Sequence, residues 1–151
     1  MSEDELRRFV EEQQTLIVAT DGPDGRPHLT VLWYVVREGE PWIFTYASSQ
    51  KVRNLERSPR ATLLLETGTE YANMRGATLY SDATIHREPE MVAGVGEELF
   101  ARYGSLAGRE ADGLGHATRD AVRERVAKRV AVQFRPTRIV SWDHAKLAGA
   151  Y

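Results

Sequence analysis

Hydroxyl and basic side chains gather in the segment from Thr45 to Arg60. Ser48 and Ser49 follow an apolar, β-branched stretch, and Lys51 and Arg53 come soon after them. The N-terminus of a helix presents free backbone N–H groups and a partial positive charge, so it suits a phosphate. Basic side chains oppose that charge, and an anion that neutralises Lys51 and Arg53 explains their place. The segment indicates a phosphate site, but a helix whose basic side chains simply face water explains the same pattern.

Arg57 and Arg60 extend this positive patch in a chain whose net charge is −2. Because the net charge is small and negative, the protein as a whole does not attract nucleic acid or an anionic membrane. A binding site for a polyanion must therefore be a local cluster of basic residues. Basic residues are poorly interleaved with exposed aromatics, which argues against single-stranded nucleic acid. No apolar run approaches the roughly 20 residues of a membrane span, and the acidic start is unlike a signal peptide. We expect a soluble, cytoplasmic protein with no membrane or nucleic-acid partner.

Other chemical signals are weak, and we predict no metal site and name no catalytic residue. The chain has no cysteine, which excludes disulfides, thiolate metal ligands and a thiol nucleophile. The four histidines, His28, His86, His116 and His144, are far apart in sequence and lack metal-ligand spacing. Gly94-Val95-Gly96 lies inside a helical pattern rather than after a strand, so it does not indicate a dinucleotide fingerprint.

The elements that must position the basic segment are short strands with small helices. At 151 residues we expect one domain spanning 1–151. Strands are predicted at 15–20, 28–37, 42–46, 61–66, 76–86, 130–134 and 138–142. Helices are predicted after a Ser2/Glu5 capping box, at 50–57 behind Ser48 and Ser49, from Pro89, and at 117–128, with a Gly-rich connection over 104–115. Tight turns make the strands mostly antiparallel, so we predict a mainly β (α+β) fold that closes as a small barrel.

The predicted strand from His28 to Arg37 is apolar on both faces. One face carries Leu29, Val31, Trp33 and Val35, and the other carries Thr30, Leu32, Tyr34 and Val36. A strand of this kind is covered on both sides. In so small a protein we interpret the second cover as a partner subunit or a flat ligand.

Five motifs, spread over nearly the whole chain, carry a family resemblance. They are Ile17-Val18-Ala19-Thr20, Asp24-Gly25-Arg26-Pro27, Ser49-Gln50-Lys51-Val52-Arg53-Asn54-Leu55-Glu56-Arg57-Ser58-Pro59-Arg60, Arg75-Gly76 and Ser141-Trp142-Asp143-His144-Ala145-Lys146-Leu147. Together they resemble the pyridoxamine 5′-phosphate oxidase-like split-barrel flavoproteins, and most closely the actinobacterial branch that uses the deazaflavin coenzyme F420. The S-x-K-x-R-N-L element with its trailing S-P-R is the most specific of the five.

The resemblance implies an antiparallel split β-barrel that works as a homodimer, with its cofactor at the dimer interface. It places the cofactor ring on Thr30, Val31, Leu32 and Trp33. The implied phosphate ligands follow the third strand and are Thr45, Ser48, Ser49, Gln50, Lys51 and Arg53, with Asn54 and Arg57 in the same element. The C-terminal region of the partner subunit, around Trp142 to Lys146, covers the ring.

The expected cofactor is coenzyme F420, with flavin mononucleotide (FMN) as the alternative. Family members that oxidise pyridoxamine phosphate carry a C-terminal Arg-His element for the substrate phosphate. Asp143-His144-Ala145-Lys146 is a different pattern. Coenzyme F420 carries several negative charges, which the basic residues of the patch, with Arg26, could meet.

The resemblance implies an F420H2-dependent reductase that passes a hydride to a small unsaturated, quinone-like or tetrapyrrole substrate, such as biliverdin. Such a protein need only bind, orient and exclude water, because the deazaflavin itself carries the hydride chemistry. Two alternatives stay open: an FMN-dependent oxidase or reductase of the same fold, and a non-catalytic carrier of the cofactor or of haem-like ligands. We expect the substrate between the loop 70–74 and the partner's C-terminus.

Overall fold

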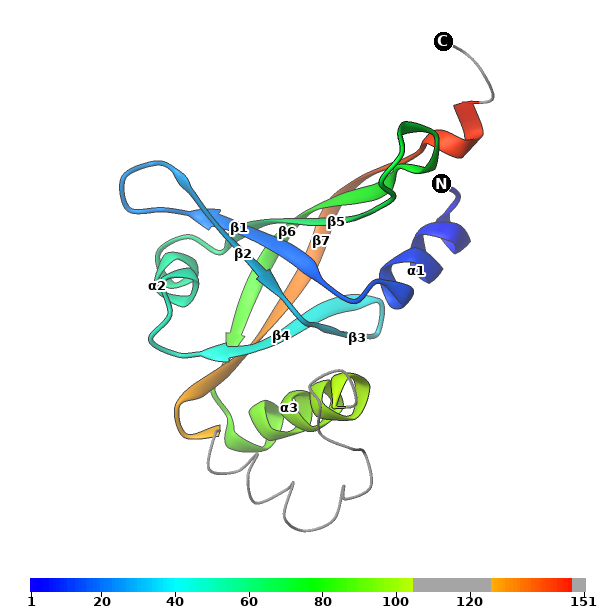
Figure 1. Ribbon diagram of the computed structural model, residues 1–151. Helices are drawn as coiled ribbons and strands as arrows, with labels where there is room; N and C mark the ends of the chain where they lie inside the picture. Colours follow the sequence, from blue (N-terminus) through cyan, green and yellow to red (C-terminus); the bar gives the residue numbers. More distant parts are fainter. Residues whose placement is uncertain (105–125, 148–151) are drawn as a thin grey trace.

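The computed structural model describes residues 1–104 and 126–147, and these form one curled sheet with helices around it (Figure 1). The elements in chain order are α1 (Glu3–Glu12), β1 (Leu16–Asp21), β2 (Pro27–Leu32), β3 (Val35–Arg37), β4 (Glu40–Tyr46), α2 (Gln50–Arg57), β5 (Arg60–Thr67), η1 (Tyr71–Asn73), β6 (Arg75–His86), α3 (Pro89–Tyr103), β7 (Arg129–Asp143) and η2 (His144–Leu147). The strand order is β2-β1-β5-β6-β7-β4-β3, and every pairing is antiparallel. The predicted α+β antiparallel split barrel is confirmed.

The prediction of one strand over 28–37 is wrong, because two strands occupy that stretch. β2 lies at one end of the strand order and β3 at the other, and only Trp33 and Tyr34 join them. The alternation of buried and exposed residues breaks here, since Tyr34 is 0% exposed and the next residue, Val35, is also buried. Both edges of the sheet must meet at this link, which forces the sheet to curl into a barrel that stays open elsewhere.

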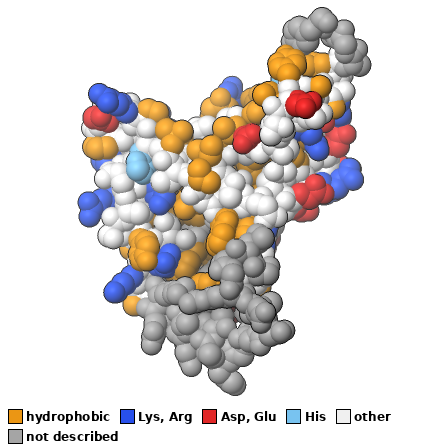
Figure 2. Space-filling model, in the orientation of Figure 1, with side chains coloured by type: hydrophobic (Ala, Val, Ile, Leu, Met, Phe, Trp, Pro, Cys, Tyr) orange, Lys and Arg blue, Asp and Glu red, His pale blue; other side chains and the backbone are white. Residues whose placement is uncertain are grey.

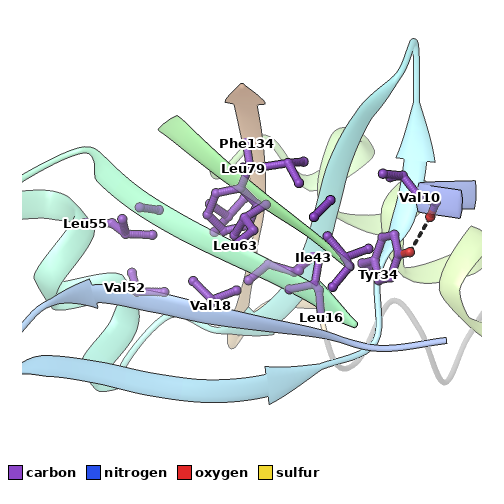
Figure 3. Packing of buried hydrophobic residues seen from close by; sticks show 14 of the residues in the cluster. Val10, Leu16, Val18, Tyr34, Ile43, Val52, Leu55, Leu63, Leu79 and Phe134 are labelled. Atoms are coloured by element: carbon purple, nitrogen blue, oxygen red, sulfur yellow. Dashed lines mark hydrogen bonds between the residues drawn. The ribbon is translucent and has the colours of Figure 1, made fainter. Parts of the chain in front are cut away.

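Tyr34 anchors the link to two helices. Its hydroxyl donates a hydrogen bond to the carbonyl oxygen of Val10 at the end of α1 (Figure 3). Its own carbonyl oxygen accepts from the Tyr103 hydroxyl at 2.8 Å and from Arg102 Nη1 at 3.3 Å, both on the last turn of α3. Burial raises the pKa of the Tyr34 hydroxyl well above its ordinary value, so it stays a neutral donor.

The core lies inside the curl of the sheet, and a second cluster lies under α3. Val18, Ile43, Leu63 and Phe134 are fully buried in the first, and they come from four different strands (Figure 3). The second cluster packs α3 against β3, β4 and β7 and includes Trp42, which is 6% exposed. Trp42 is thus a core residue, and the predicted Ser2/Glu5 capping box is confirmed.

β7 also differs from its prediction, because the two strands expected at 130–134 and 138–142 are one continuous strand. The pairing of β6 with β7 shifts register between Tyr80 and Ser81, opposite Pro136. Proline has no N–H to give to the ladder, and a bulge lets the strand continue past it. The predicted connection over 104–115 and helix over 117–128 fall almost entirely on residues outside the described part of the chain.

The Tyr34 hydroxyl should contribute measurably to stability. We expect Tyr34→Phe to lower the free energy of unfolding by about 1–3 kcal/mol, because a buried carbonyl loses its donor. Urea unfolding followed by circular dichroism measures this. Tyr80→Phe removes a hydroxyl from a half-exposed tyrosine and should change stability by less than about 0.5 kcal/mol. Equal midpoints for the two variants would contradict an anchoring role for the Tyr34 hydroxyl.

Candidate functional site

Three of the predicted phosphate ligands come together where β4 ends and α2 begins. Thr45 lies at the end of β4, Ser49 is the N-cap residue of α2, and Lys51 lies in its first turn. The Lys51 side chain folds inward, so that its Nζ donates a hydrogen bond to Thr45 Oγ1 at 3.1 Å. Thr45 is 5% exposed and Lys51 is 7% exposed. The first turn of α2 therefore carries an inward-facing ammonium group.

Lys51 has no carboxylate partner among the described residues. Its pKa is lowered from the ordinary 10.5, and the cause is burial. A buried ammonium is costly unless an anion pairs with it. Its environment therefore favours an external anion over a structural role for the charge.

Two hydroxyl groups support the same conclusion. Ser49 Oγ is buried and has no hydrogen-bond partner in the described structure, and the same holds for Thr30 Oγ1 on β2. Ser49 is the N-cap residue of α2, but its side chain makes no capping hydrogen bond. Buried polar atoms are nearly always paired with protein, water or a ligand. An unused hydroxyl, a buried ammonium and a helix N-terminus together fit a phosphate.

Asn54 and Gln50 hold α2 in place. Asn54 is fully buried, and its Nδ2 donates to Thr20 Oγ1 on β1 at 3.0 Å. Its Oδ1 accepts from Gln50 Nε2 at 2.8 Å. The bond from Asn54 to Thr20 fixes α2 against β1, and the bond from Gln50 stays within the helix and holds the Asn54 amide. Thr20 therefore supports the start of α2, although the sequence analysis did not name it as a site residue. Its role depends on where β1 lies relative to α2, which no local sequence pattern indicates.

The predicted positive patch divides into two parts. Arg57 Nη2 donates to the backbone oxygen of Asp21 at 2.7 Å, and Arg60 forms an ion pair with the Asp21 carboxylate at 2.9 Å. The Arg60 hydrogen bond is the main cause that lowers the pKa of Asp21. Arg53 is exposed, and within the described residues no carboxylate pairs with it. Besides Lys51, Arg53 is thus the cation of this element that is open to an external anion.

β2, which α2 contacts, presents an open apolar face on the side away from α2. Leu29, Val31 and Trp33 are 58%, 63% and 42% exposed. β2 pairs with β1 alone, so the backbone of its other edge faces no strand of the described chain. Figure 2 shows apolar side chains at the surface of the sheet with basic side chains gathered on the left. The expected cover on both sides of this strand is therefore incomplete within one chain.

Trp142 lies far from α2 in the same chain, at the opposite end of the sheet (Figure 1). Its ring packs on Gly76, where an added Cβ would lie 2.1 Å from the indole Cζ2. Beyond it, His144 Nδ1 lies 2.8 Å from the carbonyl oxygen of Tyr71 in η1. The loop 70–74 and the C-terminal region, both expected at the substrate, are therefore neighbours of one another but not of α2 in one chain.

The burial of Lys51 has a measurable consequence for stability. Because its folded pKa is lowered, the unfolded chain binds more protons between that pKa and 10.5, and stability rises with pH across this window. We expect the stability of the wild type relative to Lys51→Met to increase as pH rises, measured by urea unfolding in phosphate-free buffer. Arg7→Met removes an exposed cation on α1 and should follow the wild-type profile. Parallel profiles for wild type and Lys51→Met would contradict an unpaired buried ammonium.

Comparisons with solved structures agree with this architecture. A conserved hypothetical protein from Mycobacterium tuberculosis shares 41% identity with the chain, covers 98% of it and 88% of its own length, and superposes with a TM-score of 0.86. The heme storage protein HutZ from Vibrio cholerae has 18% identity, coverage of 93% of each chain and a TM-score of 0.68. A protein described as an F420 reductase has 18% identity, coverage of 89% of this chain and 94% of its own, and a TM-score of 0.67. The two more distant likenesses show the fold alone.

No significant match was found among curated proteins. No helix in the described residues has the length and apolar character needed to cross a membrane. The family model described as pyridoxamine 5′-phosphate oxidase matches residues 2–143, which is nearly the entire chain. By this match, and with its curled antiparallel sheet, the chain belongs to the pyridoxamine 5′-phosphate oxidase-like split-barrel family.

Proposed function

We propose that this protein is an F420H2-dependent reductase that transfers a hydride from the deazaflavin to a small unsaturated, quinone-like or tetrapyrrole substrate. The observation that carries the proposal is the buried ammonium of Lys51, which has no carboxylate partner in the described chain and lies in the first turn of α2. β2, which α2 contacts, has an open apolar face on its other side, and this face offers a surface for a flat ring.

The residues present fit such a cofactor. Lys51 and Ser49 would bind its phosphate, with Thr45 orienting the ammonium group. The free edge of β2 around Thr30 would meet the ring, and the exposed Arg53 would meet further negative charge. FMN carries one phosphate, whereas coenzyme F420 adds an oligoglutamate tail, so a second open cation favours the deazaflavin.

In this arrangement the cofactor and the protein have different roles. The reduced cofactor supplies the hydride when bound. The residues of the chain bind the phosphate, orient the ring along β2 and exclude water from one side of it. No described side chain has to act as a general acid or base for this, so the proposal includes no catalytic residue.

A second copy of the chain would supply the missing cover of the sheet. Tyr80 on β6 and Val140 on β7 are 38% and 48% exposed, and the strand register places them on the same face of the sheet as Leu29 and Val31 of β2. Exposed apolar groups of this extent are typical of an interaction surface. We propose a homodimer in which the partner subunit's Trp142 region approaches the ring, because one chain keeps that region away from α2.

Cofactor titration tests the proposed function. We expect wild-type protein to bind coenzyme F420 more tightly than FMN, measured by cofactor fluorescence. Lys51→Met should raise the Kd for F420 by about tenfold to hundredfold through loss of a charge-assisted hydrogen bond. Arg7→Met is the matched control and should leave the Kd unchanged. Tight binding of FMN alone would overturn the deazaflavin assignment, and binding of F420H2 without turnover of quinone-like or tetrapyrrole acceptors would favour a carrier.

The homodimer is tested separately by mass in solution. We expect light scattering after gel filtration to give about twice 17.0 kDa for the wild type. Tyr80→Glu combined with Val140→Glu should shift the mass toward the monomer, because two charges on one face would be buried without partners. Thr84→Glu adds a charge at an exposed position of β6 and should remain dimeric. A monomeric wild type would contradict the proposed assembly.

A further inference from the structure

The apolar face of β2 ends in a pair of stacked rings. The indole of Trp33 and the phenol ring of Tyr103 are parallel within 3°, with ring centroids 4.9 Å apart. Trp33 remains 42% exposed, while Tyr103 is fully buried. Tyr103 therefore contacts the Trp33 indole from inside the protein, while part of the indole stays exposed to solvent.

Tyr103 is itself fixed by several contacts. Its hydroxyl donates to the Tyr34 carbonyl oxygen at 2.8 Å, and the Arg102 guanidinium lies 5.2 Å from its ring centroid. Arg102 is fixed in turn, because it donates to the Gln13 carbonyl at 2.8 Å and to that of Glu11. The stack therefore rests on Tyr34, the buried residue of the link between β2 and β3.

The position of the indole suits a ring laid along β2. The exposed Leu29, Val31 and Trp33 span four positions, which is about 13 Å along an extended chain. That length is on the scale of a three-ring heterocycle. A surface side chain that is already immobilised loses less conformational entropy when a ligand stacks on it.

We propose that Tyr103 is a positioning residue that holds the Trp33 indole as a stacking surface for the planar ring of the bound ligand. The inference rests on the proposed function, since a flat cofactor ring on β2 is part of it. It goes beyond that function by assigning a role to a buried residue of α3 that faces no ligand.

The test uses lumiflavin, which has the flavin ring but no phosphate chain, and inorganic phosphate, which has no ring. We expect Tyr103→Leu to raise the Kd for lumiflavin roughly threefold to tenfold, the range that loss of one aromatic stack produces. The Kd for inorganic phosphate should stay unchanged, whereas a merely structural disturbance would weaken both. Tyr103→Phe keeps the stacked ring and should bind lumiflavin within about twofold of the wild type.

Two further variants keep the test decisive. His86→Leu also removes a ring stacked on a tryptophan, Trp42, at a centroid distance of 4.8 Å, and should not change the Kd for lumiflavin. If Tyr103→Leu fails to fold, Trp33→Leu changes only a partly exposed side chain and should cause the same loss of lumiflavin affinity.

The outcomes separate this inference from the proposed function. Unchanged lumiflavin affinity in folded Tyr103→Leu or in Trp33→Leu would overturn the stacking role even if F420 binds. Loss of lumiflavin affinity in these variants, in a protein that binds neither F420 nor FMN, would support the stacking role and overturn the proposed function.

Discussion

The two-residue link between β2 and β3 is the constraint on which the rest of the structure depends. Trp33 and Tyr34 join strands at opposite ends of the sheet order, so the sheet can neither lie flat nor close completely. Tyr34 turns inward and binds α1 and α3 to the point of closure. Trp33 turns outward and leaves β2 with one open face. The free edge of β2 and an apolar surface on the side of that strand away from α2 are thus exposed, and we propose that the anion site begins at α2.

The start of α2 shows a conflict between stability and binding. Burying Lys51 without a carboxylate costs free energy that the surrounding packing must offset. Asn54 and Arg57 supply part of that support, since they fix the helix to β1 and to the turn at Asp21. Any anion that binds the folded chain there also stabilises it by mass action. The site is therefore expected to be most stable when it is filled.

Much of this arrangement could be predicted from the sequence, because local signals determine it. The capping box, the helix at 50–57 and the basic residues at its start follow from residue types at fixed spacing. The break at Trp33 could not be predicted in this way, because period-two alternation does not reveal which neighbour each half of a strand pairs with. Asp21 binds Arg57 and Arg60, and Tyr103 stacks on Trp33, across long stretches of sequence. Such contacts arise only once the sheet has curled.

The long ladder between β6 and β7 has a consequence for how the chain folds. It joins Arg75 to Asp143 and His86 to Ala131, so a large loop must close before its hydrogen bonds form. The hairpins β1–β2, β3–β4 and β5–β6 close over short turns and need no such search. With no cysteine to tie the ends together, we expect β7 to dock last, completing the barrel between β6 and β4.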